Sequence, residues 1–191
     1  MNKKEITDFF NKLAPSWDKE QVLNEDVISL IFEKGGIEKG RHILDVACGT
    51  GVLFPEYIRR GVRLTAIDIS PEMVKKAKEK FPSADVICGD AEEYIFEEKF
   101  DAVMIYNAFP HFVNSERLFR NLFSALKENG RLTVAHGMSE KALEECHSGG
   151  AKNVSLPLPS KEKLSFMMSE FFDVDFVLSD EQMYMVTGTK K

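Results

Sequence analysis

Cysteine is scarce in this sequence. Cys48, Cys88 and Cys146 are odd in number and far apart, and no C-x-x-C pair occurs. This pattern argues against a disulfide framework or a cysteine-rich zinc motif and is typical of reduced thiols in the cytoplasm. No apolar run approaches the ~18 residues of a membrane-spanning helix, and no long apolar segment follows residues 1–5. We therefore expect a cytoplasmic protein without a membrane partner.

Basic residues are too few for a nucleic-acid partner. The 25 Lys and Arg residues are outnumbered by 31 Asp and Glu residues, which gives a net charge of −6, whereas binding to a phosphate backbone needs a concentrated basic surface. Repeats, low-complexity tracts and long linkers are also absent. A chain of 191 residues that is 43% hydrophobic predicts one globular domain over residues 1–191. We expect a monomer or homodimer that acts on a small-molecule substrate.

The most informative stretch runs over residues 41–70. An apolar run at 43–46 ends in the small-residue turn 47–51, and a segment with helical period follows. A second apolar run, 64–67, then stops at Asp68. Strand, glycine-rich turn, helix, strand and acidic residue in this order predict a βαβ unit that binds a nucleoside.

The residue types of this unit have specific physical uses. Small residues at Ala47, Gly49 and Gly51 let the backbone turn sharply and let a ligand come close. The helix that follows points free backbone N–H groups at that ligand. The Asp68 carboxylate can accept hydrogen bonds from both hydroxyls of a ribose. The alternative is a purely structural turn, with Asp68 only capping a helix that begins at Ser70.

The glycine pattern also indicates which nucleoside is bound. A dinucleotide fingerprint needs a third glycine three residues after the second, and Phe54 occupies that place. The pattern Asp45-x-Ala47-x-Gly49-x-Gly51 instead resembles the first motif of the class I S-adenosylmethionine (SAM) methyltransferases, with Ala47 at the usual first glycine. The resemblance implies an α/β, Rossmann-like, doubly wound sheet of seven strands, mostly parallel with an antiparallel last strand. It also implies SAM as cofactor and S-adenosylhomocysteine (SAH) as product.

Two other segments are similar to this family. Residues 9–18 resemble the N-terminal segment of small-molecule methyltransferases, the quinone-biosynthesis group among them, which folds as a lid over the cofactor. The alternative for Trp17 is that it only seals the edge of the core. Asp90-Ala91, placed directly after the third strand, resembles the family's adenine site. The resemblance thus implies a cofactor site made of Trp17, Asp45, Ala47, Gly49, Thr50, Gly51, Asp68, Ile69, Met73, Asp90, Ala91, Asn107 and Ala108.

The resemblance also implies a role for each part of that site. Asp45 would support the loop and the sulfonium–amino end, and Asp68 would bind the ribose. Ile69 and Met73 would lie beside the adenine, which Asp90 and Ala91 would read. The Asn107 carbonyl and Ala108 would line the methionine arm.

Hydrophobic periodicity predicts the remaining elements. The expected helices are 3–12, 22–34, 71–80, 115–127 and 160–169, with a further helix after the glycine turn that buries Leu53, Tyr57 and Ile58. The expected later strands are 84–88, 100–106, 131–136, 172–178 and 182–189. Residues 1–36 are expected to form a helical lid or cap, and 137–159 an insertion that covers the acceptor site.

Histidines are the candidates for acid–base chemistry. His111 and His136 follow neighbouring strands at the carboxyl edge of the sheet, where ligands bind in such folds, so both are expected to face the bound methyl group. His42 precedes the first strand at the far end and is expected to be structural. Cys146 and His147 stand beside a glycine-rich break at 148–150 in the insertion.

Three classes of function remain open at this point. The first is a SAM-dependent methyltransferase that transfers a methyl group to an unidentified small molecule by in-line displacement, with no bound metal expected. The second is an NAD or nucleotide-sugar Rossmann enzyme, which Phe54 and the Asp90-Ala91 pair disfavour. The third is a SAM-binding protein without transferase activity, or a metal-handling one that uses His136, Cys146 and His147.

Overall fold

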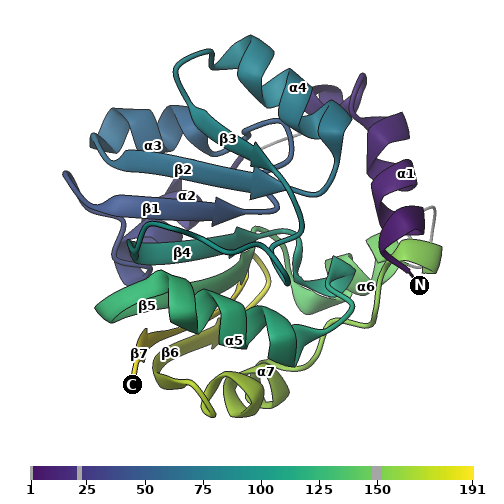
Figure 1. The fold of residues 1–191 in the computed structure, drawn as a ribbon. Helices are drawn as coiled ribbons and strands as arrows, with labels where there is room; N and C mark the ends of the chain where they lie inside the picture. Colours follow the sequence, from purple (N-terminus) through teal and green to yellow (C-terminus); the bar gives the residue numbers. More distant parts are fainter. Residues whose placement is uncertain (1, 21–22, 148–151) are drawn as a thin grey trace.

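A seven-stranded sheet forms the centre of the molecule (Figure 1). The computed structural model describes residues 2–20, 23–147 and 152–191. Within them the strands lie in the order β3-β2-β1-β4-β5-β7-β6. Their bounds are β1 His42–Val46, β2 Arg63–Asp68, β3 Asp85–Cys88, β4 Phe100–Tyr106, β5 Leu126–His136, β6 Phe172–Ser179 and β7 Tyr184–Lys190.

The sheet is parallel except at one strand. β1 pairs in parallel with β2 and β4, and the parallel pairing extends to β3 on one side and β5 on the other. β7 runs antiparallel to both β5 and β6. A tight turn joins these last two strands, in which the Asp180 carboxylate accepts from the backbone N–H groups of Gln182 and Met183. The expected seven-stranded sheet with an antiparallel last strand is therefore confirmed.

Helices cover both faces of the sheet. They are α1 Lys3–Leu13, α2 Glu25–Lys34, α3 Phe54–Arg60, α4 Pro71–Lys80, α5 Ser115–Ala125, α6 Glu140–His147 and α7 Lys161–Met168, with short 3₁₀ turns η1 Trp17–Glu20, η2 Phe109–His111 and η3 Lys152–Val154. One apolar cluster joins α2, α3 and α4 to one face, and a second joins α5 and α7 to the other. Successive residues of β1 alternate between them, since Ile43 packs with the first cluster and Leu44 with the second.

Side-chain caps fix where most of these helices begin. Each cap accepts a hydrogen bond from a backbone N–H group of the first turn that has no partner inside the helix. At α1 the cap is a reciprocal capping box between Asn2 and Glu5. The caps of the later helices are Asn24 for α2, Ser70 for α4, Asn114 for α5 and Ser160 for α7.

Two details differ from the sequence-based expectation. α5 ends at Ala125, and β5 begins at Leu126 with a register shift opposite Phe100 and Ala102. Asn129 within this stretch has a left-handed φ of 61°, so the expected turn is present as an irregularity inside β5. Ile58 was expected on the buried side of α3 but is 61% exposed, because the short helix packs through Tyr57 and Phe54 alone. The proposed first residue of α2, Val22, lies outside the described residues.

The carboxyl ends of the parallel strands open toward α1. In Figure 1 the arrowheads of β1, β2 and β4 point to the side of the molecule where α1 and α6 lie. α1 also contacts α4. Among the described residues, no helix has both the length and the apolar character needed to cross a bilayer.

Candidate functional site

A cleft lies at the carboxyl edge of the sheet, between the strand ends and the N-terminal segment (residues 2–20). It encloses about 890 Å³, its open mouth included. The loops after β1, β2, β3 and β4 form its floor and sides, and α1 and η1 form its cover. The sequence-predicted residues that line it are Trp17, Ala47, Gly49, Asp68, Ile69, Met73, Asp90, Ala91, Asn107, Ala108 and His111.

The turn after β1 is built from left-handed residues. Ala47, Gly49 and Gly51 have φ values of 57°, 55° and 82°. A Cβ on Gly51 would lie 2.8 Å from the ring of Phe54, so only glycine fits there. Ala47 replaces the glycine usual in the resembling motif and still adopts the left-handed region, at a cost of about 1–2 kcal/mol. The turn holds this conformation and leaves the Gly49 N–H pointing at the next strand end.

The Asp68 carboxylate accepts a hydrogen bond from that N–H group. One oxygen of its carboxylate accepts from Gly49 N at 2.8 Å and the other from Ser70 N at 2.8 Å. The residue is 8% exposed, and burial raises the pKa of its carboxyl to about 6, although the two backbone N–H groups lower it in part. A carboxylate has about four acceptor positions, so two remain for hydroxyl groups of a ligand.

Asp45 stands behind the loop rather than in the cleft wall. It is 2% exposed, and burial raises the pKa of its carboxyl well above the ordinary value, with a further increase from the charge of Asp68. Burial likewise raises the pKa of Tyr57, and the charge of Asp45 adds to that shift. Asp45 is thus a buried carboxyl of β1 that does not line the cleft.

Thr50 and Gly51 also lie outside the wall of the cleft. The Thr50 hydroxyl donates to Asp18 Oδ1 at 2.5 Å, and Lys80 Nζ lies 2.9 Å from both Asp18 oxygens. Burial raises the pKa of Asp18, but the Thr50 hydroxyl and the Lys80 charge outweigh it, and the net pKa is lowered. Thr50 thus binds the N-terminal segment next to Trp17, whose ring lies over the glycine turn.

The opposite end of the cleft carries a cluster of carboxylates around Lys3. The Lys3 ammonium pairs with Asp90, with Glu92 at 3.0 Å and with Glu93 at 2.9 Å. Burial lowers the pKa of Lys3, but these three partners outweigh it and raise the pKa above its ordinary value. Glu92 is 3% exposed and also accepts from Val113 N at 2.8 Å. The cluster ties α1 to the loop that follows β3.

Asn107 ends β4 in a left-handed conformation, with a φ of 53°. Its N–H donates to Ala135 O at 2.9 Å, and its side-chain oxygen accepts from Gly137 N at 2.9 Å. The neighbouring Tyr106 hydroxyl is close enough that a Cβ on Gly137 would overlap it. Burial raises the pKa of Tyr106 to about 12, while a hydrogen bond with the Asn107 side chain lowers it in part. The ends of β4 and β5 are thus held together beneath the cleft.

The structure separates the two histidines that were expected to face one ligand. His111 lines the cleft, with Nδ1 2.9 Å from Val154 O and the ring edge-on to Phe10 at 4.9 Å. His136 is 1% exposed, packs edge-on against Tyr184 and does not line the cleft. The reason is alternation along β5, which turns His136 to the same face as Val134 and the α5–α7 cluster.

Comparisons with known proteins agree with this geometry. A family model described as a methyltransferase domain matches residues 43–130. Malonyl-[acyl-carrier protein] O-methyltransferase 1 of Ilyobacter polytropus is 32% identical over 141 residues, which cover 71% of this chain and 53% of that protein. The demethylmenaquinone methyltransferase of Renibacterium salmoninarum is 30% identical over 141 residues, which cover 69% of this chain and 58% of that protein.

The chain belongs to the class I SAM-dependent methyltransferases. It spans just over half of the length of the two relatives named above. The crystal structure of magnesium protoporphyrin IX methyltransferase from Synechocystis PCC 6803, with bound SAH, has a TM-score of 0.73 to it over 100% of both chains at 15% identity. That likeness shows the fold.

Several wall residues of the cleft were not found from sequence. They are Lys3, Ile6, Phe10, Cys48, Val52, Ile67, Gly89, Glu92, Tyr106, Phe112 and Val113. Those next to a recognised motif, such as Cys48 and Tyr106, could have been found by extending the motif by one residue. Lys3 could not, because its partners lie some 90 positions further along the chain.

No group of three or more His, Cys, Asp or Glu residues in the described part of the chain is arranged to hold a metal ion. The side chains of Cys146 and His147, and the glycine-rich break at 148–150, lie outside the described residues.

Proposed function

We propose that this protein transfers a methyl group from SAM to a small-molecule acceptor. The observation that carries the proposal is the position of Asp68, whose carboxylate is held at the cleft wall by Gly49 N and Ser70 N with acceptor positions to spare. Two neighbouring ribose hydroxyls are the ligand groups that match such a carboxylate. The apolar wall after β4, across the cleft from it, supplies a surface for an acceptor.

The donor would lie along the floor of the cleft. Asp68 would bind the ribose, Met73 and Ala91 would flank the adenine, and Asp90 would accept from its amino group. The glycine turn and Asn107 would hold the methionine arm. Asp45 acts from behind, by supporting the turn rather than by touching the donor.

When bound, SAM supplies an activated methyl group on a sulfonium. The acceptor would take that methyl group as the methyl carbon–sulfur bond breaks, and SAH would be the leaving group. The chain's own contribution is to hold both reactants in line, which can be worth ~7–11 kcal/mol of the barrier. A base is needed only where the acceptor still carries its proton at working pH.

His111 is the side chain we assign to that proton. A carbonyl can only accept, so the short contact from Nδ1 to Val154 O places the ring proton on Nδ1. In the neutral ring Nε2 then carries the lone pair, and it takes the acceptor's proton as the new bond forms. We assign no acid–base step to His136, which packs outside the cleft wall.

The charges of the cleft favour a neutral acceptor. Its described wall contains carboxylates at Asp68, Asp90 and Glu92, and its ammonium at Lys3 is already paired with Asp90, Glu92 and Glu93. A carboxylate acceptor, as in the named malonyl relative, would lack a counter-charge among these described residues. The aromatic walls at Phe10, Trp17 and Phe112 support an aromatic acceptor, closer to that of the named menaquinone relative.

We also propose that the N-terminal segment covers the bound donor and that residues 137–159 border the acceptor. The first point is supported by Trp17 and Phe10, which lie over the cleft. The second is supported by Val154 and Ser155, which contact the ring of His111. Both segments would have to move for ligands to exchange.

The test has two stages. Calorimetry with SAH and with NAD identifies the nucleoside, and we expect SAH alone to bind. Incubation with methyl-labelled SAM and a metabolite extract then identifies the acceptor. With it, His111→Gln should lower turnover by ~10²–10⁴-fold and abolish the loss of turnover at low pH that protonation of this base would cause, while leaving SAH affinity unchanged.

The matched control is His42→Gln, at the far end of β1, where Nε2 lies 3.0 Å from Thr65 Oγ1. It should leave turnover unchanged. NAD binding in place of SAH would reject the proposal, and unchanged turnover in His111→Gln would remove the base but not the donor site.

A further inference from the structure

Two apolar grooves lie outside the cleft, on the face of the molecule that carries α5 and α7. The inner groove lies between η2, residues 156–159 and α7, and it encloses about 470 Å³ with its open mouth included. The outer groove lies between α5 and α7 and encloses about 810 Å³ on the same measure. The proposed methyl transfer uses neither of them.

The grooves and the cleft share lining residues. Phe112 lines both the cleft and the inner groove. Ser115 and Met167 line both the inner and the outer groove. The cleft and the two grooves therefore follow one another past Phe112 and Met167 to the end of α7, and we call the two grooves together the α5–α7 track.

The track is fixed in shape along its inner part. Leu156 N donates to Pro110 O at 2.7 Å, which binds the 156–159 segment to η2. Pro157 and Pro159 restrict the backbone of the same wall. A groove with rigid walls loses little conformational entropy when it binds a ligand.

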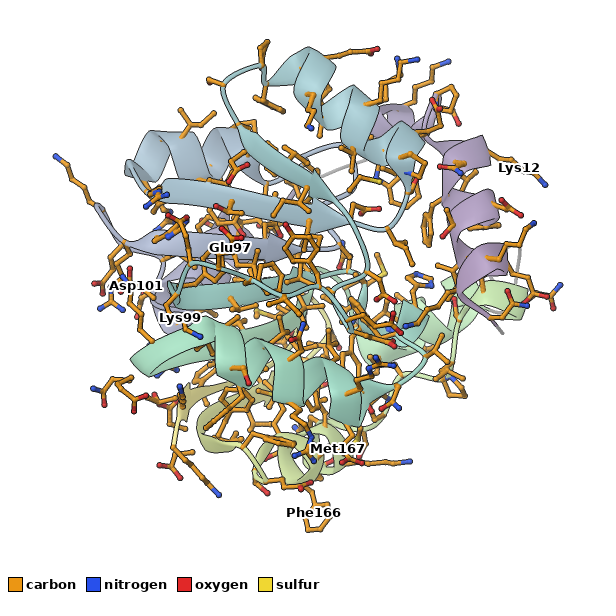
Figure 2. The ribbon with its side chains drawn as sticks, in the orientation of Figure 1. Lys12, Glu97, Lys99, Asp101, Phe166 and Met167 are labelled. Atoms are coloured by element: carbon orange, nitrogen blue, oxygen red, sulfur yellow. The ribbon has the colours of Figure 1, made fainter. Side chains whose placement is uncertain are left out.

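The outer end exposes apolar surface to water. Phe166 is 79% exposed, and Figure 2 shows it projecting from α7 away from the body of the molecule, next to Met167. Leu156, at the inner groove, is 44% exposed. Exposed apolar surface of this kind marks a binding surface more often than a lone exposed side chain does. The charged groups beside the track are Glu116 and Glu170 at its outer end and Lys163 at its inner groove.

We propose that the α5–α7 track holds a hydrocarbon tail of the methyl acceptor, while the reacting head of the same molecule lies in the cleft. This inference rests on the proposed function. The position of the inner groove directly beside the cleft, with Phe112 lining both, favours a tail of the acceptor over a separate protein or a second copy, neither of which would need a groove next to the cleft. Glu116 and Glu170 at the outer end oppose an anionic lipid surface.

The experiment uses 4-alkylphenols with linear chains of two to twelve carbons as probes, with the protein saturated with SAH. Calorimetry measures the dissociation constant of each probe. Transfer of each methylene from water to an apolar wall should tighten binding roughly threefold to fourfold. The gain should continue to chains long enough to pass Phe112.

Variants locate the tail. Met167→Lys places a charge at the junction of the two grooves and should remove the gain from the outer part of the chain, whereas Met167→Leu should keep it. Ile95→Ser is the matched control, because Ile95 is 84% exposed and belongs to neither groove. SAH affinity should not change in any of the three.

A second readout does not depend on the folding of a variant. With ¹³C-methyl methionine, the NMR signal of Met167 should shift on addition of the dodecyl probe, and that of Met185, buried on the other face of the sheet, should not.

An affinity that stops rising at short chains, or an unmoved Met167 signal, overturns the tail site even where SAH binds. Loss of SAH binding itself would count against the proposed function instead. Binding to neutral phosphatidylcholine vesicles, or a dimer in solution, that Phe166→Ser abolishes would assign the surface to a membrane or to a second copy and overturn the proposal.

Discussion

Asp68 shapes the cleft before any ligand binds. Its two backbone partners, Gly49 N and Ser70 N, belong to the loops after β1 and β2, so one carboxylate joins both loops. The same carboxylate is the acceptor we assign to the ribose. Asp68→Ala removes hydrogen bonds to a charged group worth about 1.5–3 kcal/mol each. We expect SAH affinity to fall at least tenfold by calorimetry, with the far-UV circular dichroism of a folded protein.

The pKa of Asp68, raised to about 6, makes donor binding depend on pH. Only the ionised carboxylate offers all its acceptor positions to the ribose, so affinity should fall as the pH drops through 6. Between pH 7.5 and pH 5 the ionised fraction, and with it the affinity for SAH, should decrease about tenfold. The control is Asp68→Asn, whose weaker binding should not vary over this range.

The stability of the ligand-free protein should change with pH in the direction opposite to the affinity for SAH. The folded state takes up the Asp68 proton at about pH 6, above the ordinary 3.8 of the carboxyl. The folded state therefore binds more protons than the unfolded state between these values, and the contribution of Asp68 to stability increases as the pH falls through 6. Urea unfolding at pH 7.5 and pH 5.5 measures this change in the free energy of unfolding. An equal change in Asp68→Asn would assign the pH dependence to another group.

Gly137 and Tyr106 form a pair that a double-mutant cycle can test. A Cβ at Gly137 would overlap the Tyr106 hydroxyl, so Gly137→Ala should displace the ring and disturb Asn107, which Gly137 N holds. We expect a loss of stability of ~1–3 kcal/mol and weaker SAH binding. Tyr106→Phe removes the overlapping atom, so the double variant should regain part of the lost stability and part of the lost SAH affinity. Additive losses would show that the two side chains do not meet.

At the scale of elements, the N-terminal segment is bound to three separate loops of the cleft. Lys3 reaches the loop after β3, the Asn11 side chain accepts from Ser70 Oγ at 2.7 Å, and Asp18 reaches Thr50 and Lys80. Each loop also lines the proposed donor site. Opening the segment must break these bonds, so they should slow the release of the donor product.

Thr50→Val tests this slowing. It removes the donor to Asp18 without touching the wall of the cleft, so SAH should dissociate severalfold faster, at ~1 kcal/mol for one such bond. The fluorescence of Trp17, the one tryptophan of the chain, reports the rate in stopped flow because its ring lies over the glycine turn. Arg59→Gln, which breaks an exposed pair with Glu56 far from Trp17, is the control. An unchanged rate in Thr50→Val would mean that the segment does not limit release.

The same elements show what sequence can and cannot predict. Continuous apolar runs predicted the parallel strands, and the order of apolar run, glycine turn and Asp68 predicted the βαβ unit that borders the cleft, because both are local patterns. The face of the sheet on which His136 lies depends on the irregularity at 127–130. One extra or missing residue there would move every later side chain of β5 to the opposite face of the sheet. The partners of Thr50 and Lys3 depend on how a distant segment docks, which no local pattern contains.

At the scale of the whole molecule, the order of the strands decides where ligands meet. The chain reverses direction across the sheet between β1 and β4, and this switch point opens a crevice at the carboxyl ends of the strands. In the proposed function, the loops after β1, β2 and β3 would hold the donor in that crevice, and the loop after β4 would border the acceptor. The antiparallel β7 closes the far edge of β5 and supports the face on which the α5–α7 track lies.

Because every loop of the cleft would contact the donor, donor binding should stabilise the molecule as a whole. A ligand that binds only the folded state, at a hundred times its dissociation constant, adds ~2.7 kcal/mol. For a domain of this size 1 kcal/mol raises the melting temperature by ~2–4 °C, so SAH should raise it by ~5–10 °C. Differential scanning calorimetry measures the shift, and NAD at the same concentration should produce none. Asp68→Ala, at the same SAH concentration, should lose most of the increase, because its fractional saturation falls with its affinity. A shift with NAD and none with SAH would reject the donor site proposed for this cleft.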